Sequence, residues 1–395
     1  MKVAVTHDWL VNYGGGERVL QQLLVLYPDA DIYTLVYDAK KMASFFPPEK
    51  VHVSRLQRIP MATRLYPKML SLMPGAWEAF DLTGYDLVLS SSSSCAKGVI
   101  TRPDTPHIAY IHSPMRYAWD LYYEYYRRSG MLTRFFMQRW IPGLRQWDYI
   151  SSQRVDCLVS NSAYIARRIQ KFWGREATVV NPPVNTVSFT PNGQPHEGFY
   201  LAFSRLVPYK RLDLAVQACG RTGRKLVVIG SGGQEKELRQ LAASFKGADI
   251  RFTGRIADAE VKSYLQRCRA LIFCAQEDFG IIPVEAQACG RPVIAYGSGG
   301  ALETVIDGTT GVFFAEQTAE SLLEALDRFE RLDGEGAFKA GIITAHAAAF
   351  SEERFRSQMA AVIEKTILTV KSVRQGQAVP AGQPPRAEHG TGGAR

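Results

Sequence analysis

The sequence predicts an α/β protein with two domains, each built on a parallel sheet. At 395 residues the chain is long enough for two domains of ordinary size, and its 46% hydrophobic content can supply two cores. Short apolar runs alternate with glycine-punctuated loops and helix-like segments, most clearly over residues 270–314. This alternation is typical of parallel strands that are buried on both faces and connected by helices.

Composition narrows the class of partner. The formal net charge of +9 favours anionic partners such as nucleotide diphosphates, acidic membrane surfaces or nucleic acid. No zinc-finger, KH or RRM pattern occurs, so we expect no nucleic-acid partner. No run of eighteen apolar residues occurs, so we expect no transmembrane span, and MKVAVTHDWL predicts a strand rather than a signal peptide. The six cysteines lie singly and indicate reduced thiols in a cytoplasmic protein.

The first domain begins with a strand at residues 1–6 and continues through the glycine loop Gly14–Gly16 into an amphipathic helix. A strand at residues 86–90 ends in a serine run, which suits a loop and a helix cap. A later strand at residues 108–111 ends at His112, which places an imidazole at the edge of the sheet where ligands bind. The D-x-D sequence at residues 29–31 precedes a strand, and we interpret it as a turn rather than a metal site.

Two stretches of the first domain mix basic and apolar residues. Residues 55–74 carry four basic and no acidic side chains among Leu, Ile, Met and Tyr, and residues 117–140 are rich in aromatic and basic side chains. Each stretch could lie on an anionic membrane surface. The first could equally pack its apolar side chains on the core, and the second could form an acceptor channel.

The second domain follows a linker at residues 181–184, where consecutive prolines favour an extended crossing. Arg205 and Lys210 then lie between a strand and a helix, so their charges can converge on an anion. The sequence KLVVIGSGG at residues 225–233 imitates a dinucleotide fingerprint, but Glu235 follows where a third glycine is needed. This mismatch argues against an NAD-dependent oxidoreductase.

Residues 270–314 predict two consecutive strand, loop and helix units. Pro283 suits the first turn of a helix, and the backbone N–H groups of Gly280–Ile282 precede that helix, which is a geometry that binds anions such as a diphosphate. Glu277 in the loop and Glu285, placed in the first helical turn, are carboxylates that can accept hydrogen bonds from vicinal hydroxyls. A glycine loop at residues 297–300 is expected at the same edge of the sheet.

The pattern E-D-F-G-I-I-P-V-E-A resembles the E-x7-E signature of retaining glycosyltransferases of family 4, and the downstream G-x-P-V-I and G-G-x-x-E-x-V-x-D-G runs strengthen the match. The resemblance implies two doubly wound, Rossmann-like parallel-sheet domains facing each other across a cleft, the GT-B fold. The Y-I-H-x-P-M-R-Y-x-W-D pattern around His112 resembles a mannosyl- and glucosyltransferase branch of this family.

The resemblance also assigns roles to residues. Arg205 and Lys210 would bind the diphosphate, Glu277 the transferred sugar and Glu285 the ribose, while His112 would orient the donor sugar. The loops at residues 225–233 and 252–256 would flank the nucleobase. The predicted catalytic residues are thus His112, Arg205, Lys210 and Glu277, and the predicted donor-binding residues are Gly15, Gly16, Arg205, Lys210, Glu277, Phe279, Gly280, Ile281, Ile282 and Glu285.

We therefore expect a metal-independent, cofactor-free retaining transferase that passes mannose from GDP-mannose to a polyprenyl-diphosphate-linked oligosaccharide, in polysaccharide or lipopolysaccharide synthesis. The protein would lie in the cytoplasm, peripherally on the inner face of the cytoplasmic membrane. The alternatives are a UDP-sugar-dependent glucosyltransferase of the same fold and a nucleotide-sugar epimerase. Expected boundaries are residues 1–183 for the acceptor domain with a helix at 351–373 packing back on it, 184–350 for the donor domain, and 374–395 for a disordered tail.

Overall fold

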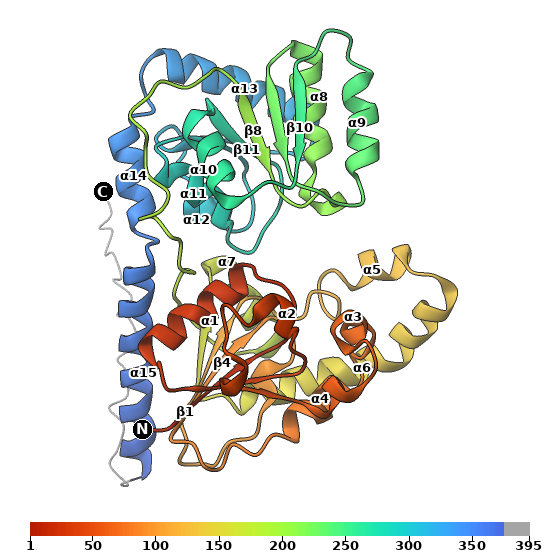
Figure 1. Cartoon of the computed structure of the whole chain (residues 1–395), viewed down its shortest axis with the longest axis vertical. Coiled ribbons are helices and arrows are strands. Elements are labelled where there is room, and N and C mark those ends of the chain that lie inside the picture. The colour runs from red at the N-terminus through yellow and green to blue at the C-terminus, as the bar shows by residue number, and fades with distance from the viewer. Residues whose placement is uncertain (375–395) are drawn as a thin grey trace, which may run out of the picture.

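The computed structural model describes residues 1–374 and contains two parallel sheets (Figure 1). The first sheet has seven strands in the order β3-β2-β1-β4-β5-β6-β7, and the second has six in the order β10-β9-β8-β11-β12-β13. In both orders the chain starts near the middle and reverses direction, which is the doubly wound arrangement. The prediction of two parallel α/β sheets is confirmed.

The first sheet and its surrounding helices occupy the N-terminal half of the chain. Its strands are β1 Val3–His7, β2 Asp31–Thr34, β3 Val51–Val53, β4 Leu87–Ser92, β5 His107–Ile111, β6 Cys157–Ser160 and β7 Thr178–Val179. Its helices are α1 Gly15–Leu26, α2 Ala39–Met42, α3 Ala62–Leu65, α4 Met73–Glu78, α5 Tyr122–Arg128, α6 Met131–Gln153 and α7 Ala163–Trp173, with 3-10 turns at Pro48–Lys50, Arg55–Arg58, Tyr66–Lys68 and Ala96–Gly98.

The second sheet follows the linker. Its strands are β8 Tyr200–Phe203, β9 Leu226–Ile229, β10 Ile250–Gly254, β11 Ala270–Phe273, β12 Val293–Tyr296 and β13 Gly311–Phe314. Its helices are α8 Leu212–Thr222, α9 Glu235–Ala243, α10 Asp258–Arg267, α11 Ile281–Ala288, α12 Ala301–Thr304, α13 Ala319–Gly334 and α14 Ala340–Ala348, with a 3-10 turn at Pro208–Lys210. Successive residues of β8 enter opposite cores: Leu201 joins one apolar cluster and Ala202 the other, so this sheet is buried on both faces.

The chain crosses between the two halves twice, and the crossings lie side by side. The backbone N–H of Val184 in the outgoing linker donates to the carbonyl of Phe350 at 2.9 Å, just before the long helix α15, Glu352–Arg374. Phe355, Met359 and Ile363 of α15 are buried in the core of the first sheet, beside α1 (Figure 1). The C-terminal helix is therefore part of the packing of the first half.

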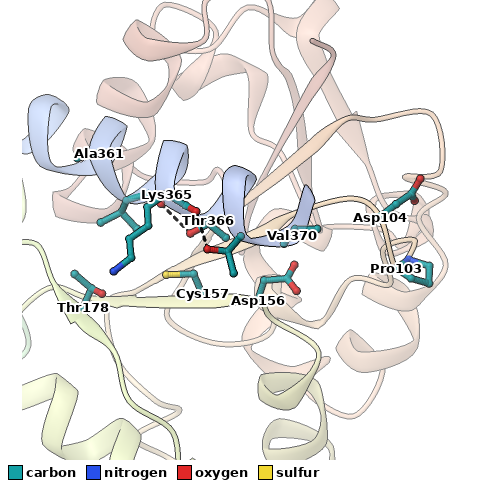
Figure 2. Close-up of a pocket in the computed structure, with 11 residues that line it drawn as sticks. Pro103, Asp104, Asp156, Cys157, Thr178, Ala361, Lys365, Thr366 and Val370 are labelled. Carbon is teal, nitrogen blue, oxygen red and sulfur yellow. Dashed lines mark hydrogen bonds between the residues drawn. The ribbon is translucent and has the colours of Figure 1, made fainter. Parts of the chain in front are cut away.

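A cavity of about 760 Å³ lies between α15 and strands β6 and β7 of the first sheet (Figure 2). Cys157, Thr178, Lys365 and Thr366 are among the residues that line it. Burial raises the pKa of the Cys157 thiol, which therefore stays protonated and inert. This cavity lies under a packed helix and lacks the predicted site residues.

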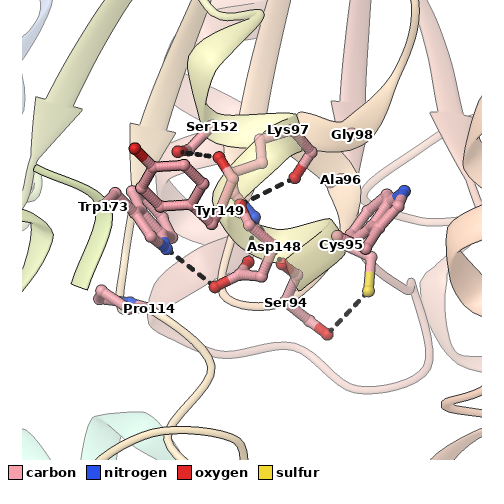
Figure 3. Close-up of polar contacts among 12 residues, drawn as sticks. Ser94, Cys95, Ala96, Lys97, Gly98, Pro114, Asp148, Tyr149, Ser152 and Trp173 are labelled. Carbon is pink, nitrogen blue, oxygen red and sulfur yellow. Dashed lines mark hydrogen bonds and ion pairs between the residues drawn. The ribbon is translucent and has the colours of Figure 1, made fainter. Parts of the chain in front are cut away.

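A fully buried ion pair joins the turn after β4 to helix α6. Lys97 contacts Asp148, and the Nζ atom of Lys97 lies 4.7 Å from the ring centre of Trp173 (Figure 3). The second carboxylate oxygen of Asp148 accepts hydrogen bonds from the indole N–H groups of Trp119 at 2.7 Å and Trp173 at 2.8 Å. Two indole N–H groups and one ammonium thus contact the buried Asp148 carboxylate, and they offset the free-energy cost of placing its charge in a low-dielectric interior.

The basic stretch at residues 55–74 forms short helical turns rather than one helix. Leu56, Ala62, Met69 and Met73 are buried in the core, whereas the four basic side chains of this stretch, together with Met61 and Leu72, are exposed. Most of the apolar side chains of the stretch therefore pack on the core, as in the core-packing alternative.

The aromatic stretch differs, because α5 and the start of α6 project from the side of the first half opposite α15 (Figure 1). Here Met131, Leu132 and Phe135 expose 88%, 71% and 62% of their surface.

Three smaller expectations need correction. The helix of the second unit predicted within residues 270–314 has a single turn and ends at Thr304, because Val305 has extended backbone. The predicted loop at 252–256 lies partly in β10, which pairs with β9 up to Gly254. Helix α15 includes Arg374, and the remaining residues of the predicted disordered tail lie outside the described residues. None of the helices within residues 1–374 is both long and apolar enough to span a bilayer.

Candidate active site

A cleft of about 1100 Å³ lies between the two sheets and receives residues from both halves of the chain. The first half contributes the loop after β1, the start of α1 and the end of β5. The second half contributes the loops after β8 and β11 and the start of α11. All eleven predicted site residues line this cleft: Gly15, Gly16, His112, Arg205, Lys210, Glu277, Phe279, Gly280, Ile281, Ile282 and Glu285.

Helix α11 presents its N-terminus to the cleft. It begins at Ile281, and Gly280 before it has φ +93°, a left-handed conformation that glycine adopts without strain. Gly15 approaches from the other half so closely that an added Cβ would lie 2.9 Å from the Cδ1 atom of Ile281. The two glycines allow the backbones of the two halves to meet at the free N–H groups of α11.

Glu285 lies in the second turn of α11 and not in the first, because the helix begins two residues before Pro283. Its carboxylate is buried and accepts a hydrogen bond at 2.6 Å from Arg18, which belongs to α1 across the cleft. Burial raises the pKa of Glu285, and the Arg18 guanidinium partly offsets that rise. Sequence reasoning missed Arg18, since its partner is 267 residues away.

Glu277 and Lys210 are brought into direct contact. The Lys210 ammonium pairs with Oε1 of Glu277, while Arg205 donates to the hydroxyl of Tyr209 at 3.0 Å. The predicted glycine loop packs against the backbone of Glu277, because the N–H of Gly300 donates to the Glu277 carbonyl at 2.9 Å. A Cβ on Gly300 would lie 2.2 Å from the Cα atom of Phe279. Only glycine fits there.

His112 lies at the end of β5, as predicted, and is held on three sides. Its backbone N–H donates to the Ser92 carbonyl and its carbonyl accepts from the Asn161 side chain, both at 2.9 Å. Its Nε2 atom lies 2.8 Å from the Ser91 hydroxyl. Burial, with a smaller effect from His7, lowers the pKa of His112 to about 3, so the ring is neutral near pH 7.

A second histidine permits a test of this burial effect. His107 in β5 is completely buried, and burial, reinforced by Arg154, Arg175 and Lys97, lowers its pKa to about 3. Between about pH 3 and the unfolded histidine pKa of ~6.5, the unfolded chain binds a proton that the native chain does not, so stability falls as the pH falls.

We expect the difference in free energy of unfolding between the wild type and His107→Gln to change by up to ~1.4 kcal/mol per pH unit in this window. Urea unfolding at pH 7.5, 6.0 and 5.0 measures it, and the wild type should lose more stability than the variant. A difference that does not change with pH would show that His107 is accessible to protons in the native state.

The second half also docks on the first through carboxylates that sequence reasoning left out. Asp278 contacts Arg116 and lies 3.4 Å from Arg168, and its backbone carbonyl accepts from the Ser162 hydroxyl at 2.6 Å. Glu303 of α12 accepts the first N–H groups of α7, at 2.9 and 3.0 Å, and so caps a helix of the other half. Both residues stand within the glycosyltransferase-like runs, but nothing in the sequence indicates their partners.

Within residues 1–374, His, Cys, Asp and Glu side chains form no group of three or more that could hold a metal ion. The charged groups that face the cleft beside the α11 N-terminus are instead cationic side chains and carboxylates, among them Arg205, Lys210, Glu277 and Glu285.

Two doubly wound parallel sheets that meet across such a cleft constitute the GT-B fold. Residues 13–188 match the profile of glycosyltransferase family 4, and residues 188–338 match that of glycosyl transferases group 1. The chain belongs to these glycosyltransferases, as the E-x7-E pattern predicts.

Curated relatives and solved structures agree with this placement. A GDP-mannose-dependent monoacylated alpha-(1-6)-phosphatidylinositol monomannoside mannosyltransferase of Corynebacterium glutamicum is 32% identical, over 47% of this chain and 57% of the relative. A D-inositol 3-phosphate glycosyltransferase of Acidothermus cellulolyticus is 30% identical, over 49% and 56%. The chain thus spans about half the length of the curated relatives it matches. The crystal structure of HepE from Anabaena in complex with UDP is similar in fold, with a TM-score of 0.69 at 18% identity over 92% of this chain and 100% of that one.

Proposed function

We propose that this protein is a retaining glycosyltransferase that moves a hexose from a nucleotide-diphosphate sugar to an acceptor hydroxyl without a metal ion. The proposal rests on one observation. The N-terminus of α11, two cationic side chains and two carboxylates, all from the second half, lie together in one cleft. Helix N–H groups and cations suit a diphosphate, while carboxylates suit the hydroxyls on either side of it.

The difficult step is departure of the nucleotide diphosphate, because negative charge grows on its leaving oxygen. Arg205, Lys210 and the N–H groups that begin α11 would stabilise that charge in place of a metal ion. Glu277, held beside Lys210, would orient the sugar hydroxyls, and Glu285 would accept from the ribose. The neutral His112 would contact the sugar through its ring or carbonyl, and the acceptor would attack on the face that the leaving group vacates.

For the donor we propose GDP-mannose, supported by the motifs around residues 7–20 and 110–120 and by the mannosyltransferase relative. UDP-glucose remains the alternative donor, since the structurally similar HepE was solved with UDP-glucose. The acceptor we propose is a polyprenyl-diphosphate-linked oligosaccharide in polysaccharide or lipopolysaccharide synthesis. A domain division at residue 183, with α15 packed on the first half, suits an acceptor domain and a donor domain.

A donor panel tests this proposal. We expect GDP and GDP-mannose to raise the melting temperature more than UDP, ADP or NADH, and we expect slow hydrolysis of GDP-mannose to continue after treatment with EDTA. If UDP-glucose alone stabilises the protein, the donor is UDP-glucose rather than GDP-mannose, and the proposed mechanism is unchanged. Loss of hydrolysis in EDTA with rescue by magnesium would contradict the metal-independent mechanism, and stabilisation by NADH alone would contradict the transferase.

We further propose that the protein docks peripherally on the inner face of the cytoplasmic membrane through α5 and the start of α6. The exposed side chains of this region are apolar and aromatic, and they are accompanied by exposed Arg127, Arg128 and Arg139. Apolar burial with ~1 kcal/mol for each basic residue near an anionic leaflet gives reversible, salt-sensitive binding.

Sedimentation with liposomes measures this docking. We expect binding to anionic vesicles but not to neutral ones, and a loss of binding in the double variant Phe135→Ser, Trp140→Ser. The matched control is Arg55→Glu, Arg58→Glu in the other basic stretch, where the adjacent Leu56 is buried in the core, and it should bind nearly as well as the wild type. Equal loss in both variants would point to charge alone, and no binding at low salt would remove the membrane proposal.

A further inference from the structure

A continuous chain of polar contacts runs along the first-half wall of the cleft and ends at His112. Oε1 of Glu17 in α1 lies 3.4 Å from Nε2 of His7, Nδ1 of His7 lies 3.0 Å from the Ser91 hydroxyl, and that hydroxyl lies 2.8 Å from Nε2 of His112. The ring of His7 is buried, and Ser91 has no exposed surface. Glu17, His7 and His112 line the cleft.

The sheet itself holds these groups in register. β1 and β4 are adjacent parallel strands in which His7 pairs with Ser91, and His112 follows directly after β5, the next strand of the sheet. Because β-strand side chains alternate between faces, Ser91 points to one side while Ser90, its neighbour, bonds to Thr6 and His107 on the other. The contacts among His7, Ser91 and His112 therefore depend on strand pairing, and helix α1 adds Glu17.

The direction of the hydrogen bonds follows from the chemistry of the two ends. A carboxylate can only accept, so Nε2 of His7 carries a hydrogen, and where that is the only ring hydrogen Nδ1 must accept from the Ser91 hydroxyl. A hydroxyl has a single hydrogen, so Ser91 must in turn accept from Nε2–H of His112. A neutral imidazole carries one N–H, which leaves Nδ1 of His112 as an acceptor.

We propose that Glu17, His7 and Ser91 are positioning residues that fix His112 as the Nε2–H tautomer, so that its Nδ1 atom accepts a hydrogen bond from a hydroxyl of the transferred sugar. The contact with the sugar rests on the proposed function, whereas the tautomer of His112 is a property of the protein alone. The neutral ring of His112 is consistent with it, since a protonated ring would offer no acceptor.

The glycine at position 16 fits this role. A Cβ built on Gly16 would lie 3.4 Å from Cε1 of His7 and 3.6 Å from Nε2 of His112. These are ordinary van der Waals distances, so Gly16 lies directly beside both imidazoles at the wall of the cleft.

Nitrogen NMR of the full-length protein labelled with ¹⁵N-histidine tests the tautomer, with the His112 signals identified by their loss in His112→Asn. We expect a single Nε2–H tautomer for His112 in the wild type and a mixture of tautomers in Ser91→Ala, while the matched control Ser92→Ala keeps the single tautomer. A wild-type Nδ1–H tautomer at His112, or an unchanged tautomer in Ser91→Ala, would overturn the proposal. Neither outcome depends on activity.

Kinetics then test whether the tautomer matters. Ser91→Ala and Glu17→Leu should each lower kcat by roughly 10- to 100-fold, the scale of a misplaced reacting group, with little change in the KM for the donor. Glu17→Gln, which keeps an acceptor oxygen for His7, should recover a large part of the loss. Equal losses in Glu17→Gln and Glu17→Leu, with unchanged folding by circular dichroism, would contradict the direction proposed. A wild type without transfer or hydrolysis of any nucleotide sugar would instead refute the proposed function.

Discussion

Replacement of Lys210 by alanine is expected to lower kcat by about 10²- to 10³-fold, the scale measured when one preorganised donor to a developing charge is removed. The Lys210 ammonium is held in the cleft by Glu277, close to the loop that leads into α11. Its charge therefore needs no large rearrangement to reach the leaving diphosphate. Arg205→Ala should have an effect of similar size.

The measurement is kcat at saturating donor, with donor affinity measured separately. Arg211→Ala is the matched control, because Arg211 follows Lys210 directly but pairs with Asp213 and does not line the cleft. Since Lys210 and Glu277 are in contact, Lys210→Ala and Glu277→Ala should be strongly non-additive when combined. A kcat in Lys210→Ala equal to that of the control would mean that Lys210 does not act on the leaving group.

Asp148→Ala is expected to destabilise the protein by about 3–5 kcal/mol, the cost of removing one partner from a buried ion pair. The change leaves the Lys97 ammonium in a site without exposed surface (Figure 3), and it removes the acceptor of two indole N–H groups. Because the pair joins α6 to the turn after β4, the loss should appear as lower thermal and urea stability of the first half.

The double variant Lys97→Met, Asp148→Asn is the control. It removes both charges but keeps an acceptor oxygen for Trp119 and Trp173, so it should recover most of the stability that Asp148→Ala loses. Urea unfolding followed by tryptophan fluorescence compares the variants. If the double variant is as unstable as Asp148→Ala, the ammonium is not the source of the cost.

The sequence predicted the parallel α/β organisation because its signals are local. A strand buried on both faces is a short apolar run, as at β11, and a helix start carries its own marks, such as Gly280 and Pro283. Where the local signal was ambiguous the prediction was less precise. Glu285 was placed one turn too early, because Pro283 is compatible with each of the first helical positions.

The sequence also could not decide which of the two basic stretches exposes apolar side chains that could contact a membrane. Both basic stretches mix apolar and charged residues, and neither has a pattern that says which side chains face a core. Folding buries Leu56 and Met73 in one stretch and leaves Leu132 and Phe135 exposed in the other. Burial is decided by what packs against a side chain, and that neighbour lies elsewhere in the chain.

By itself the sequence determined which residues would gather at the carboxyl ends of the strands, because strand and loop boundaries place Lys210, Glu277 and His112 at those ends whatever the partners are. Only the tertiary structure decided what each of them contacts. Arg18 reaches Glu285, Asp278 reaches Arg116, and Ser91 links His7 to His112, across separations that range from 21 to 267 residues. Hydrogen bonds and ion pairs act over about 3 Å, so such partners are set by the register of the sheet and the closure of the two halves, which no local pattern encodes.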